Sequence, residues 1–484
     1  MILFVLNHPY HFEMENLCRV FYPAEKIRAV RADTPRPLRG HPPLKRGAVA
    51  AITRIVQKNI EVKLFIGKRR LSITKPEGDN PELAMARMLF TLLRRATGYT
   101  PPWGLLTGVR PAKLMLRLRR GDSASRAECY FRDSLWVSPE KTALAIAVAQ
   151  AEEPILARTG SRSFSLYVSI PFCPSRCSYC SFVSHTIERP SAQKLIPVYI
   201  EKLCAEIAYT GEIASELGLH LESIYIGGGT PGILSPEQLA RVCGALRASF
   251  TRPGEFTVEA GRPDALTTEK LQVLREHGVH RLCVNPQSLD DAVLARAGRR
   301  HTVGQFYEAY EMAKEAGFTL NSDLIAGLPG DTPAGFEASL RGIIALRPEN
   351  ITVHTLALKR SAALEEIHGA DACSEMLYAA SELLHAAGYA PYYLYRQSRS
   401  LGNLENIGWS LPGCACRYNV DMMEESHSIL ACGAGGVTKL KQPGGDYLER
   451  VFNLKYPYEY QARFEELLER KARIKAFYGA YNIL

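Results

Sequence analysis

The sequence lacks any long apolar segment. Among its 484 residues, no uninterrupted hydrophobic run approaches the roughly 18 residues of a membrane-spanning helix. Residues 1–6 are apolar, but this stretch ends at Asn7, has no basic lead and is too short for a secretion signal. We therefore expect neither a membrane protein nor an exported one, and we predict a cytoplasmic location.

Repeats and biased composition are also missing. We find no low-complexity segment and no repeat beyond an alternation of predicted strands and helices. Hydrophobic residues make up 46% of the chain and charged residues 23%, which is typical of a soluble globular protein. The length is sufficient for two or three domains.

Negative charge is scarce in the first third of the chain. Residues 1–160 hold 27 Lys and Arg against 14 Asp and Glu, whereas the remainder holds 32 against 36. A basic surface suits nucleic acid, an acidic partner protein or a substrate with several carboxylates. Neither interleaved aromatic repeats nor an RNA-binding motif accompanies these residues, so a solvated basic surface is an equally good interpretation. Nucleic acid therefore stays a secondary hypothesis.

Twelve cysteines are present, and three of them lie close together in one run. In a reducing cytosol cysteines are thiols or metal ligands rather than disulfides, and isolated ones are usually small buried apolar groups. The run is Cys173-Pro174-Ser175-Arg176-Cys177-Ser178-Tyr179-Cys180, with the spacing CxxxCxxC. It offers three thiolates and no fourth ligand nearby, whereas a structural zinc site needs four. A [4Fe–4S] cluster held by three cysteines keeps one iron open for another ligand.

A further pair of cysteines has the spacing CxC, at Cys414 and Cys416. Such a pair could coordinate haem or a second metal, or relay electrons. His427 and Cys432 nearby are too loosely spaced to complete a ligand set. Spare thiols in a loop are the simpler interpretation.

Residues 165–359 alternate β-rich runs with amphipathic stretches. The predicted strands are 166–171, 224–226, 256–259, 281–285, 321–325 and 351–354. The predicted helices are 191–217, 236–250, 268–277, 303–317 and 333–346. Strands separated by helices of this length indicate βαβ units and a parallel sheet. Six units, rather than eight, predict an α/β fold with a partial (β/α)6 barrel that is open on one side.

The regions before and after this barrel differ from it. Residues 47–74 alternate apolar and polar side chains and predict a small antiparallel sheet, while residues 80–97 have helical spacing. We therefore predict a basic α+β N-terminal domain over residues 1–160 and the barrel over residues 161–360. Residues 361–484 are predicted to form a mixed α/β C-terminal region that covers the substrate.

Conformationally special or polar residues follow the predicted strands. The second strand leads into Gly227-Gly228-Gly229-Thr230-Pro231, whose glycines let the backbone approach a ligand and present peptide groups to a charged amino-acid moiety. The following strand ends carry Glu259, Gln287, Arg299 and Asp323. Singly, each could be an ordinary loop residue. Together they suit a zwitterionic sulfonium with a ribose diol, because Arg pairs with a carboxylate and acidic side chains accept hydroxyl or ammonium protons.

These motifs, in this order, resemble the radical S-adenosylmethionine (SAM) superfamily. Within it they resemble the oxygen-independent coproporphyrinogen III oxidase (coproporphyrinogen dehydrogenase) family, over about residues 165–440. The matching motifs are Tyr167-x-x-Ile170-Pro171-Phe172-Cys173, the glycine run at 227–231, Val258-Glu259-Ala260, Gln287-Ser288-Leu289, Gly298-Arg299-x-His301, Asp323-Leu324-Ile325-x-Gly327-Leu328-Pro329-Gly330 and Gly433-Ala434-Gly435-Gly436. The earlier run Trp103-Gly104-Leu105-Leu106-Thr107-Gly108-Val109-Arg110-Pro111 is most similar to the HemZ-like subgroup.

The resemblance implies a set of cofactors and site residues. Cys173, Cys177 and Cys180 would be the catalytic and metal-binding residues that hold a [4Fe–4S] cluster. One SAM molecule, or two, would contact Tyr167, Tyr179, Gly228, Gly229, Thr230, Glu259, Gln287, Arg299, Asp323, Leu356 and Val437. The implied partners are a tetrapyrrole substrate and an electron donor such as flavodoxin or ferredoxin.

The implied reaction is the oxidative decarboxylation of coproporphyrinogen III propionates to vinyl groups, giving protoporphyrinogen IX in haem biosynthesis. Two positions depart from the oxidase pattern: Phe182 stands where the oxidase has a further Cys, and Ser169 where it commonly has His. Members of the family also include haem chaperones and haem-degrading methyltransferases. A haem-binding trafficking protein on the same fold, or a radical SAM enzyme acting on another tetrapyrrole or on RNA, are therefore the alternative hypotheses.

Overall fold

The computed structural model describes the chain from residue 1 to residue 481, apart from residues 24, 33–47, 122, 181, 183, 189, 359–368 and 398. The chain divides into two compact units. The first consists of Met1–Ile146 and Arg396–Leu404, and the second of Ala147–Tyr395 and Glu405–Leu484. The segment Arg396–Leu404 therefore joins the first unit, although its neighbours in sequence on both sides belong to the second.

The first unit contains a five-stranded sheet in the order β2-β1-β3-β4-β5. Its strands are β1 (Ile2–Leu6), β2 (Arg28–Ala32), β3 (Val49–Val56), β4 (Asn59–Ile66) and β5 (Arg69–Pro76). The sheet predicted over residues 47–74 is confirmed as the antiparallel strands β3 to β5, and β1 extends it by pairing in parallel with both β2 and β3. Along β4 the alternate residues Ile60, Val62 and Leu64 are fully buried, so one face of the sheet is apolar.

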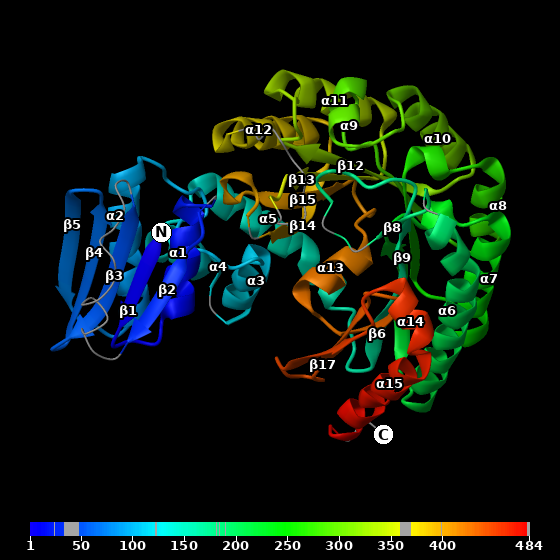
Figure 1. Ribbon diagram of the computed structural model, residues 1–484, viewed down its shortest axis with the longest axis horizontal. Helices are drawn as coiled ribbons and strands as arrows, with labels where there is room; N and C mark the ends of the chain where they lie inside the picture. The colour runs from blue at the N-terminus through cyan, green and yellow to red at the C-terminus, as the bar shows by residue number, and fades with distance from the viewer. Residues whose placement is uncertain are drawn as a thin grey trace. The chain divides into compact units, whose positions relative to one another are not determined.

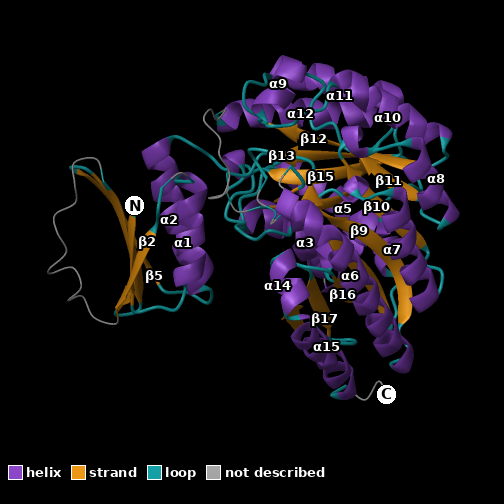
Figure 2. Cartoon of the chain, turned by 45° about the vertical axis from the view of Figure 1, so that its right-hand side comes forward, coloured by secondary structure: helices purple, strands orange, loops and turns teal. Residues whose placement is uncertain are grey.

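Helices cover this apolar face. The helices of the first unit are α1 (His11–Phe21), α2 (Pro81–Thr97), α3 (Pro111–Gly121), α4 (Ala124–Cys129), a π-helical turn (Tyr130–Ser134) and the start of α5 (Pro139–Leu156). Figure 2 shows α1 and α2 on one side of the strands. The helix predicted over residues 80–97 is confirmed as α2. It begins where the Asn80 side chain accepts a hydrogen bond from the Leu83 N–H at 3.0 Å, and it ends at Gly98 with φ of 74°.

The segment Arg396–Leu404 is anchored by the turn-rich loop that contains Trp103. The Arg396 guanidinium donates a hydrogen bond to the Leu106 carbonyl and lies 5.7 Å from the centre of the Trp103 ring. The Arg396 backbone N–H donates to the Val109 carbonyl at 2.7 Å. This loop therefore binds a distant part of the chain: Arg396 follows Leu106 by 290 positions in the sequence.

The second unit is built on an eleven-stranded sheet in the order β14-β15-β13-β12-β11-β10-β9-β6-β16-β17-β18. Its central parallel strands are β6 (Ser163–Ile170), β9 (His220–Gly228), β10 (Glu255–Gly261), β11 (Arg281–Val284), β12 (Thr319–Ala326) and β13 (Asn350–Thr355). These are the six strands predicted from the sequence, and the open (β/α)6 arrangement is confirmed. Every residue of β6 except Tyr167 is buried, as expected for a parallel strand covered on both faces.

Further strands extend the sheet on both sides. β16 (Ser428–Cys432) is parallel to β6, and β17 (Val437–Lys441) and β18 (Leu448–Phe452) continue in antiparallel order. On the other side, β15 (Glu405–Ser410) pairs antiparallel with β13, and β14 (Ala390–Arg396) lies beyond it. The C-terminal part of the chain thus contributes strands to both ends of the barrel sheet.

The helices of the second unit pack along the outside of the central strands (Figure 1). They are α6 (Pro190–Glu216), α7 (Pro236–Ser249), α8 (Thr268–Glu276), α9 (Asp291–Arg296), α10 (Val303–Glu315), α11 (Pro333–Leu346), α12 (Ala370–Ala386), α14 (Pro457–Ala462) and α15 (Phe464–Gly479). A further helix, α13 (Arg417–Glu424), lies inside this layer. The five predicted helices are confirmed as α6, α7, α8, α10 and α11. Capping boxes begin α7, with Ser235 and Gln238, and α10, with Thr302 and Gln305. None of the helices in the described chain is long and apolar enough to cross a bilayer.

Helix α13 packs against the amino edge of the central strands. Glu255, the first residue of β10, accepts hydrogen bonds from the backbone N–H groups of Arg417 and Tyr418 at 2.9 and 3.0 Å. The Arg417 guanidinium also pairs with Glu222, near the start of β9, at 2.6 Å. Cys416 is buried 3.3 Å from the Glu255 carboxylate. The CxC pair therefore lies at the opposite edge of the sheet from the three predicted ligand cysteines.

Candidate functional site

The parallel strands bring the predicted site residues to one edge of the sheet. β6 leads directly into the three-cysteine loop, residues 171–180, and β9 ends in the glycine run. Glu259 lies near the end of β10, Gln287 follows β11, and Asp323 lies in the second half of β12. Because parallel strands end at the same edge, residues from five successive strands meet there.

Backbone pairing fixes the three-cysteine loop. β7 (Phe172–Cys173) pairs with β8 (His185–Thr186), so a short two-stranded sheet closes the loop. The Cys180 N–H donates to the Cys177 carbonyl at 3.2 Å and forms a tight turn between the last two cysteines. All twelve cysteines are free thiols, so these three are available as ligands.

The three thiols are half-buried, and burial raises the pKa of Cys173 above its ordinary value. Burial raises the pKa of Cys180 to about 11, so this thiol keeps its proton at neutral pH until a metal replaces it. Thr230 Oγ1 lies 3.5 Å from Cys173 Sγ and connects the loop to the glycine run. Within the described chain, no three His, Cys, Asp or Glu side chains gather closely enough to hold a single metal ion. Cysteines that hold a cubane cluster bind separate irons, so they need not converge on one point.

The glycine run lies directly against the three-cysteine loop. The Gly229 N–H donates to the Ile170 carbonyl, and the Thr230 N–H to the Phe172 carbonyl, both at 2.8 Å. A Cβ atom on Gly229 would lie 2.5 Å from the Phe172 carbonyl oxygen and 2.9 Å from the Ile170 carbonyl oxygen. Only a residue without a side chain fits between these backbone groups.

Gly229→Ala is therefore expected to destabilise the second unit by about 1–3 kcal/mol, because the added methyl meets backbone atoms that have no rotamer to change. Urea unfolding followed by circular dichroism measures this loss. Gly244→Ala, in α7, is the matched control, since a Cβ there meets nothing within 4 Å. Alanine should stabilise that helix by about 0.5–1 kcal/mol. The interpretation is wrong if both variants change stability in the same direction and by the same amount.

A cluster of titratable side chains lies next to the glycine run. A Cβ on Gly227 would lie 2.9 Å from Glu259 Oε2, and the Tyr225 hydroxyl donates to the same oxygen at 3.5 Å. Asp323 Oδ2 lies 3.6 Å from His354 Nε2. Burial, and then the Asp323 charge, raise the pKa of Glu259 to about 7. Burial alone would lower the pKa of His354, but its hydrogen bond to Asp323 raises the pKa above its ordinary value.

Gln287 and Arg299 present polar groups that the protein does not satisfy. Gln287 has a φ of 72° and donates its N–H to the Asp323 carbonyl at 2.9 Å. Its buried Oε1 has no partner among the residues that the structure describes. Arg299 donates to the Tyr179 hydroxyl at 3.1 Å and to the Asn285 carbonyl at 2.6 Å, while its Nε has no partner in the described part of the chain. A buried polar atom left unpaired costs about 1–3 kcal/mol, so both groups are suited to a polar ligand.

The other predicted residues lie at or just inside the same edge. Tyr167 stacks on Tyr225 with ring centroids 6.4 Å apart. Gly228 has a φ of 108°, which other residues rarely adopt. Leu356 follows β13, and Val437 begins β17, directly after the loop formed by residues 433–436. The structure therefore brings all of the sequence-predicted residues into one region.

The sequence did not identify two members of the titratable cluster, His354 and Tyr225. In the sheet register Asp323 lies opposite Thr352, so His354 is two residues further along the same face of the neighbouring strand. A polar aromatic residue at the tip of a predicted strand was the available signal, but the register is needed to pair it with Asp323.

The sequence also did not identify a second polar cluster, the Glu206 network, which lies between α6, α15 and the loop after β16. Glu206 in α6 and Lys471 in α15 form a fully buried ion pair at 2.9 Å. Glu206 also accepts hydrogen bonds from the Tyr460 hydroxyl at 2.6 Å and from the Gly433 N–H at 2.7 Å. The network therefore joins three helices, α6, α14 and α15, to the glycine loop that follows β16.

Tyr199 connects the same loop to the end of β6. Its hydroxyl donates to the Ser169 carbonyl and accepts from the Ala434 N–H, both at 2.8 Å. The Ser169 hydroxyl donates to the Ala434 carbonyl at 2.8 Å. Ser169 comes directly before the last residue of β6, so these bonds position the start of the three-cysteine loop.

Comparison with known proteins places this site in a family. The family described as the radical SAM superfamily matches residues 167–343. The chain is 36% identical over 396 residues to the oxygen-independent coproporphyrinogen-III oxidase-like protein HemZ of Bacillus subtilis (strain 168), covering 79% of this chain and 78% of that protein. It is 35% identical over 199 residues to the heme chaperone HemW of the same organism, covering 40% of this chain and 51% of that protein.

A solved structure shares the fold. Coproporphyrinogen III oxidase (HemN) from Escherichia coli, described as a radical SAM enzyme, superposes with a TM-score of 0.53 at 23% identity, over 66% of this chain and 73% of that chain. The similarity to HemZ is higher in identity and extends over more of the chain. The chain belongs to the radical SAM superfamily and, within it, to the family of oxygen-independent coproporphyrinogen III oxidase-like proteins that includes HemZ.

Proposed function

We propose that this protein is a radical SAM oxidoreductase that converts propionate side chains of coproporphyrinogen III into vinyl groups, giving protoporphyrinogen IX in haem biosynthesis. One observation carries the proposal. The three-cysteine loop, the glycine run and the cluster of Glu259, Asp323 and His354 gather at one sheet edge, in a chain 36% identical to HemZ over most of its length. The reaction removes hydrogen from an unactivated carbon, which requires cofactor chemistry.

The cofactors of the radical SAM superfamily are a [4Fe–4S] cluster and SAM. The residues of this site fit both groups. Three free thiols on one loop match a cluster that keeps one iron open. The unpaired buried atoms of Gln287 and Arg299 and the carboxyl group of Glu259 match a ligand with carboxylate, ammonium and hydroxyl groups.

In this proposal each side chain has a defined task. Cys173, Cys177 and Cys180 would hold the cluster, which together with SAM would supply one-electron reduction and hydrogen-atom abstraction. Arg299 pairs with the carboxylate of SAM, and Glu259 with its ammonium group. The remaining proposed contacts to SAM are Tyr167, Tyr179, Gly228, Gly229, Thr230, Gln287, Asp323, Leu356 and Val437.

The change in the substrate balances as follows. Loss of one hydrogen atom from the β-carbon of a propionate, of CO2 and of one further electron leaves a vinyl group, and two such rounds give protoporphyrinogen IX. The adenosyl group of SAM would take up the hydrogen atom, and a one-electron acceptor would take up the electron. An electron donor such as flavodoxin or ferredoxin would supply the reducing equivalent.

The pKa of Glu259 predicts a pH dependence of SAM binding. Below pH 7 the Glu259 carboxyl is protonated, so binding the ammonium group requires the loss of that proton. We expect SAM affinity to fall by about tenfold for each pH unit below 7, and to level off above it. Glu259→Gln should bind SAM weakly at every pH and show a flat profile. Isothermal titration of the reconstituted protein checks this, and a flat profile for the unaltered protein would contradict it.

Anaerobic incubation tests the proposed reaction. Reconstituted protein would be mixed with dithionite, SAM and coproporphyrinogen III, and the products separated by chromatography. Vinyl-bearing porphyrinogen together with 5′-deoxyadenosine supports the proposal. Cleavage of SAM without any change in the porphyrinogen overturns it.

The match to HemW supports a second candidate, a haem-binding trafficking protein on the same fold. In this second candidate function, the protein binds haem and does not convert coproporphyrinogen III. Stoichiometric binding of haem, followed by transfer to an apo-haemoprotein, would favour it. An absence of haem binding combined with vinyl formation would eliminate it.

A further inference from the structure

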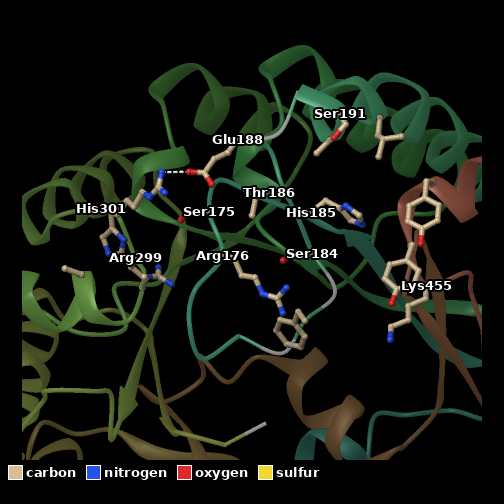
Figure 3. Close-up of a pocket in the computed structure, with 18 of the residues that line it drawn as sticks. Ser175, Arg176, Ser184, His185, Thr186, Glu188, Ser191, Arg299, His301 and Lys455 are labelled. Carbon is tan, nitrogen blue, oxygen red and sulfur yellow. Dashed lines mark hydrogen bonds and ion pairs between the residues drawn. The ribbon is translucent and has the colours of Figure 1, made fainter. Parts of the chain in front are cut away.

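A large cavity lies beside the three-cysteine loop (Figure 3). It has a volume of about 1490 Å³, and its lining residues all belong to the second unit. The wall includes Arg176 from the loop, His185 from β8, and Lys455, Tyr456 and Tyr458 from the segment around the start of α14. Pockets for drug-sized ligands are about 300–1,000 Å³, so this cavity can accept a larger molecule.

The cavity wall carries uncompensated positive charge. Arg176 is exposed, and neither Arg176 nor Lys455 forms an ion pair with any residue in the described ranges. The acidic residues of the wall have partners other than Arg176 and Lys455. Glu188 pairs with Arg300, and the Asp291 carboxylate accepts a hydrogen bond of 2.7 Å from the first N–H of α10. Arg299, the proposed partner of the SAM carboxylate, also lines the cavity. Beyond it, the positive charges of Arg176 and Lys455 are left for anionic groups on a second ligand.

Aromatic rings form another part of the wall. The rings of Tyr456 and Tyr458 are stacked, with centroids 5.4 Å apart and planes 8° from parallel. The His185 ring lies edge-on to both tyrosines, at 6.4 and 6.2 Å. Tyr458 is 51% exposed and Phe182 is 64% exposed, although apolar rings of this size are normally buried. These surfaces are suited to the face of a large unsaturated ring.

We propose that this cavity binds a propionate-bearing tetrapyrrole. Arg176 and Lys455 pair with propionate carboxylates, and Tyr458, supported by its stack on Tyr456, packs against the ring system. The inference rests on the proposed function for the identity of the ligand, while the cations and the aromatic wall define its chemical class. A concave site with aromatic walls favours such a small ligand over an acidic protein, which would present a convex surface.

Binding to the reconstituted holoprotein tests this inference independently of turnover. The probe is coproporphyrin III, the fluorescent oxidised form of the proposed substrate, and the readout is its fluorescence anisotropy under anaerobic conditions. Arg176→Ala and Lys455→Ala should each weaken binding by about tenfold, the value of one charge-assisted hydrogen bond. Tyr458→Ala should weaken coproporphyrin III binding about threefold to tenfold, and Tyr458→Phe, which keeps the ring, should bind as tightly as the unaltered protein.

Two controls make the result specific. Arg341→Ala removes an exposed arginine on α11, paired with Glu337, and should leave binding unchanged. The tetramethyl ester of coproporphyrin III lacks the carboxylates and should bind at least about tenfold more weakly than the acid. Equal affinity for acid and ester, or unchanged binding by the Arg176→Ala/Lys455→Ala double variant, would overturn the inference.

The outcomes also separate this inference from the proposed function. Binding that depends on Arg176 and Lys455, but without vinyl formation, supports the cavity as the tetrapyrrole site and overturns the oxidase proposal. Vinyl formation at unchanged rate and affinity in the double variant supports the oxidase and overturns the cavity assignment.

Discussion

Cys177→Ala is expected to abolish cluster binding and SAM cleavage, and Cys173→Ala and Cys180→Ala are expected to do the same. The three-cysteine loop supplies the thiols of the proposed cluster. Cys416 lies at the amino edge of the sheet beside Glu255. After anaerobic reconstitution, the iron content should fall from about four atoms per chain to background.

The matched control is Cys414→Ala. Cys414 is half-buried in the loop before α13, and its thiol contacts only the Pro412 carbonyl at 3.7 Å among the described residues. This variant should retain the cluster, its brown absorbance and SAM cleavage. Circular dichroism of each variant distinguishes loss of the cluster from loss of the fold. The assignment of the ligands is wrong if Cys177→Ala keeps its iron, or if Cys414→Ala loses it while folded.

Lys471→Met is expected to destabilise the second unit by about 3–5 kcal/mol, because it leaves the Glu206 carboxylate buried without its cation. Methionine fills a similar volume, so the effect reports the lost charge rather than a cavity. Glu206→Gln should have a comparable effect, since it leaves the Lys471 ammonium buried without an anion. Urea denaturation of the purified protein gives the free energy of unfolding.

Lys475→Met, on the same helix, is the control for this prediction. Lys475 pairs with Glu216 at the surface, where its side chain is 42% exposed, so its removal should cost less than about 1 kcal/mol. The double variant Glu206→Gln/Lys471→Met should lose less stability than the sum of the two single variants, because the charges share one network. Equal losses for Lys471→Met and Lys475→Met would show that the buried pair has no special role.

The Glu206 network should also affect the site. Through Gly433 and Tyr199 it holds the loop after β16 against Ser169, which precedes the three-cysteine loop. A milder variant, Tyr460→Phe, removes one hydrogen bond to Glu206 and should cost about 1 kcal/mol. We expect this variant to remain folded and to take up iron more slowly, which a reconstitution time course would show.

The barrel could be predicted from the sequence because its signals are local. Each central strand is a short β-rich run between helices, and α11 has the bounds predicted from its amphipathic pattern, with Thr332 as its N-cap. The edge strands were harder to predict. β16 is only five residues long and pairs with β6, more than 250 residues earlier, so the sequence around it contains no βαβ pattern.

The site could be predicted only in part. Residues at strand ends were identified correctly as neighbours, because parallel strands necessarily end together. Pairings that depend on register or on distant helices could not be found. His354 meets Asp323 only through the β12–β13 register, and Glu206 meets Lys471 from a helix at the other end of the chain. Glu206 is one of four glutamates in α6, and the sequence does not distinguish it from the other three.

The path of the chain between the two units has a consequence for synthesis on the ribosome. The first unit is completed by Arg396–Leu404, so its Trp103 loop lacks the contact with Arg396 until most of the second unit has emerged. N-terminal domains usually fold first during translation, but this one must wait for a segment from beyond the barrel. Nascent chains stalled before residue 396 should therefore carry an incomplete N-terminal unit. In the mature protein, a fragment cut after residue 146 should stay bound, without a covalent connection, through its contacts with Arg396–Leu404.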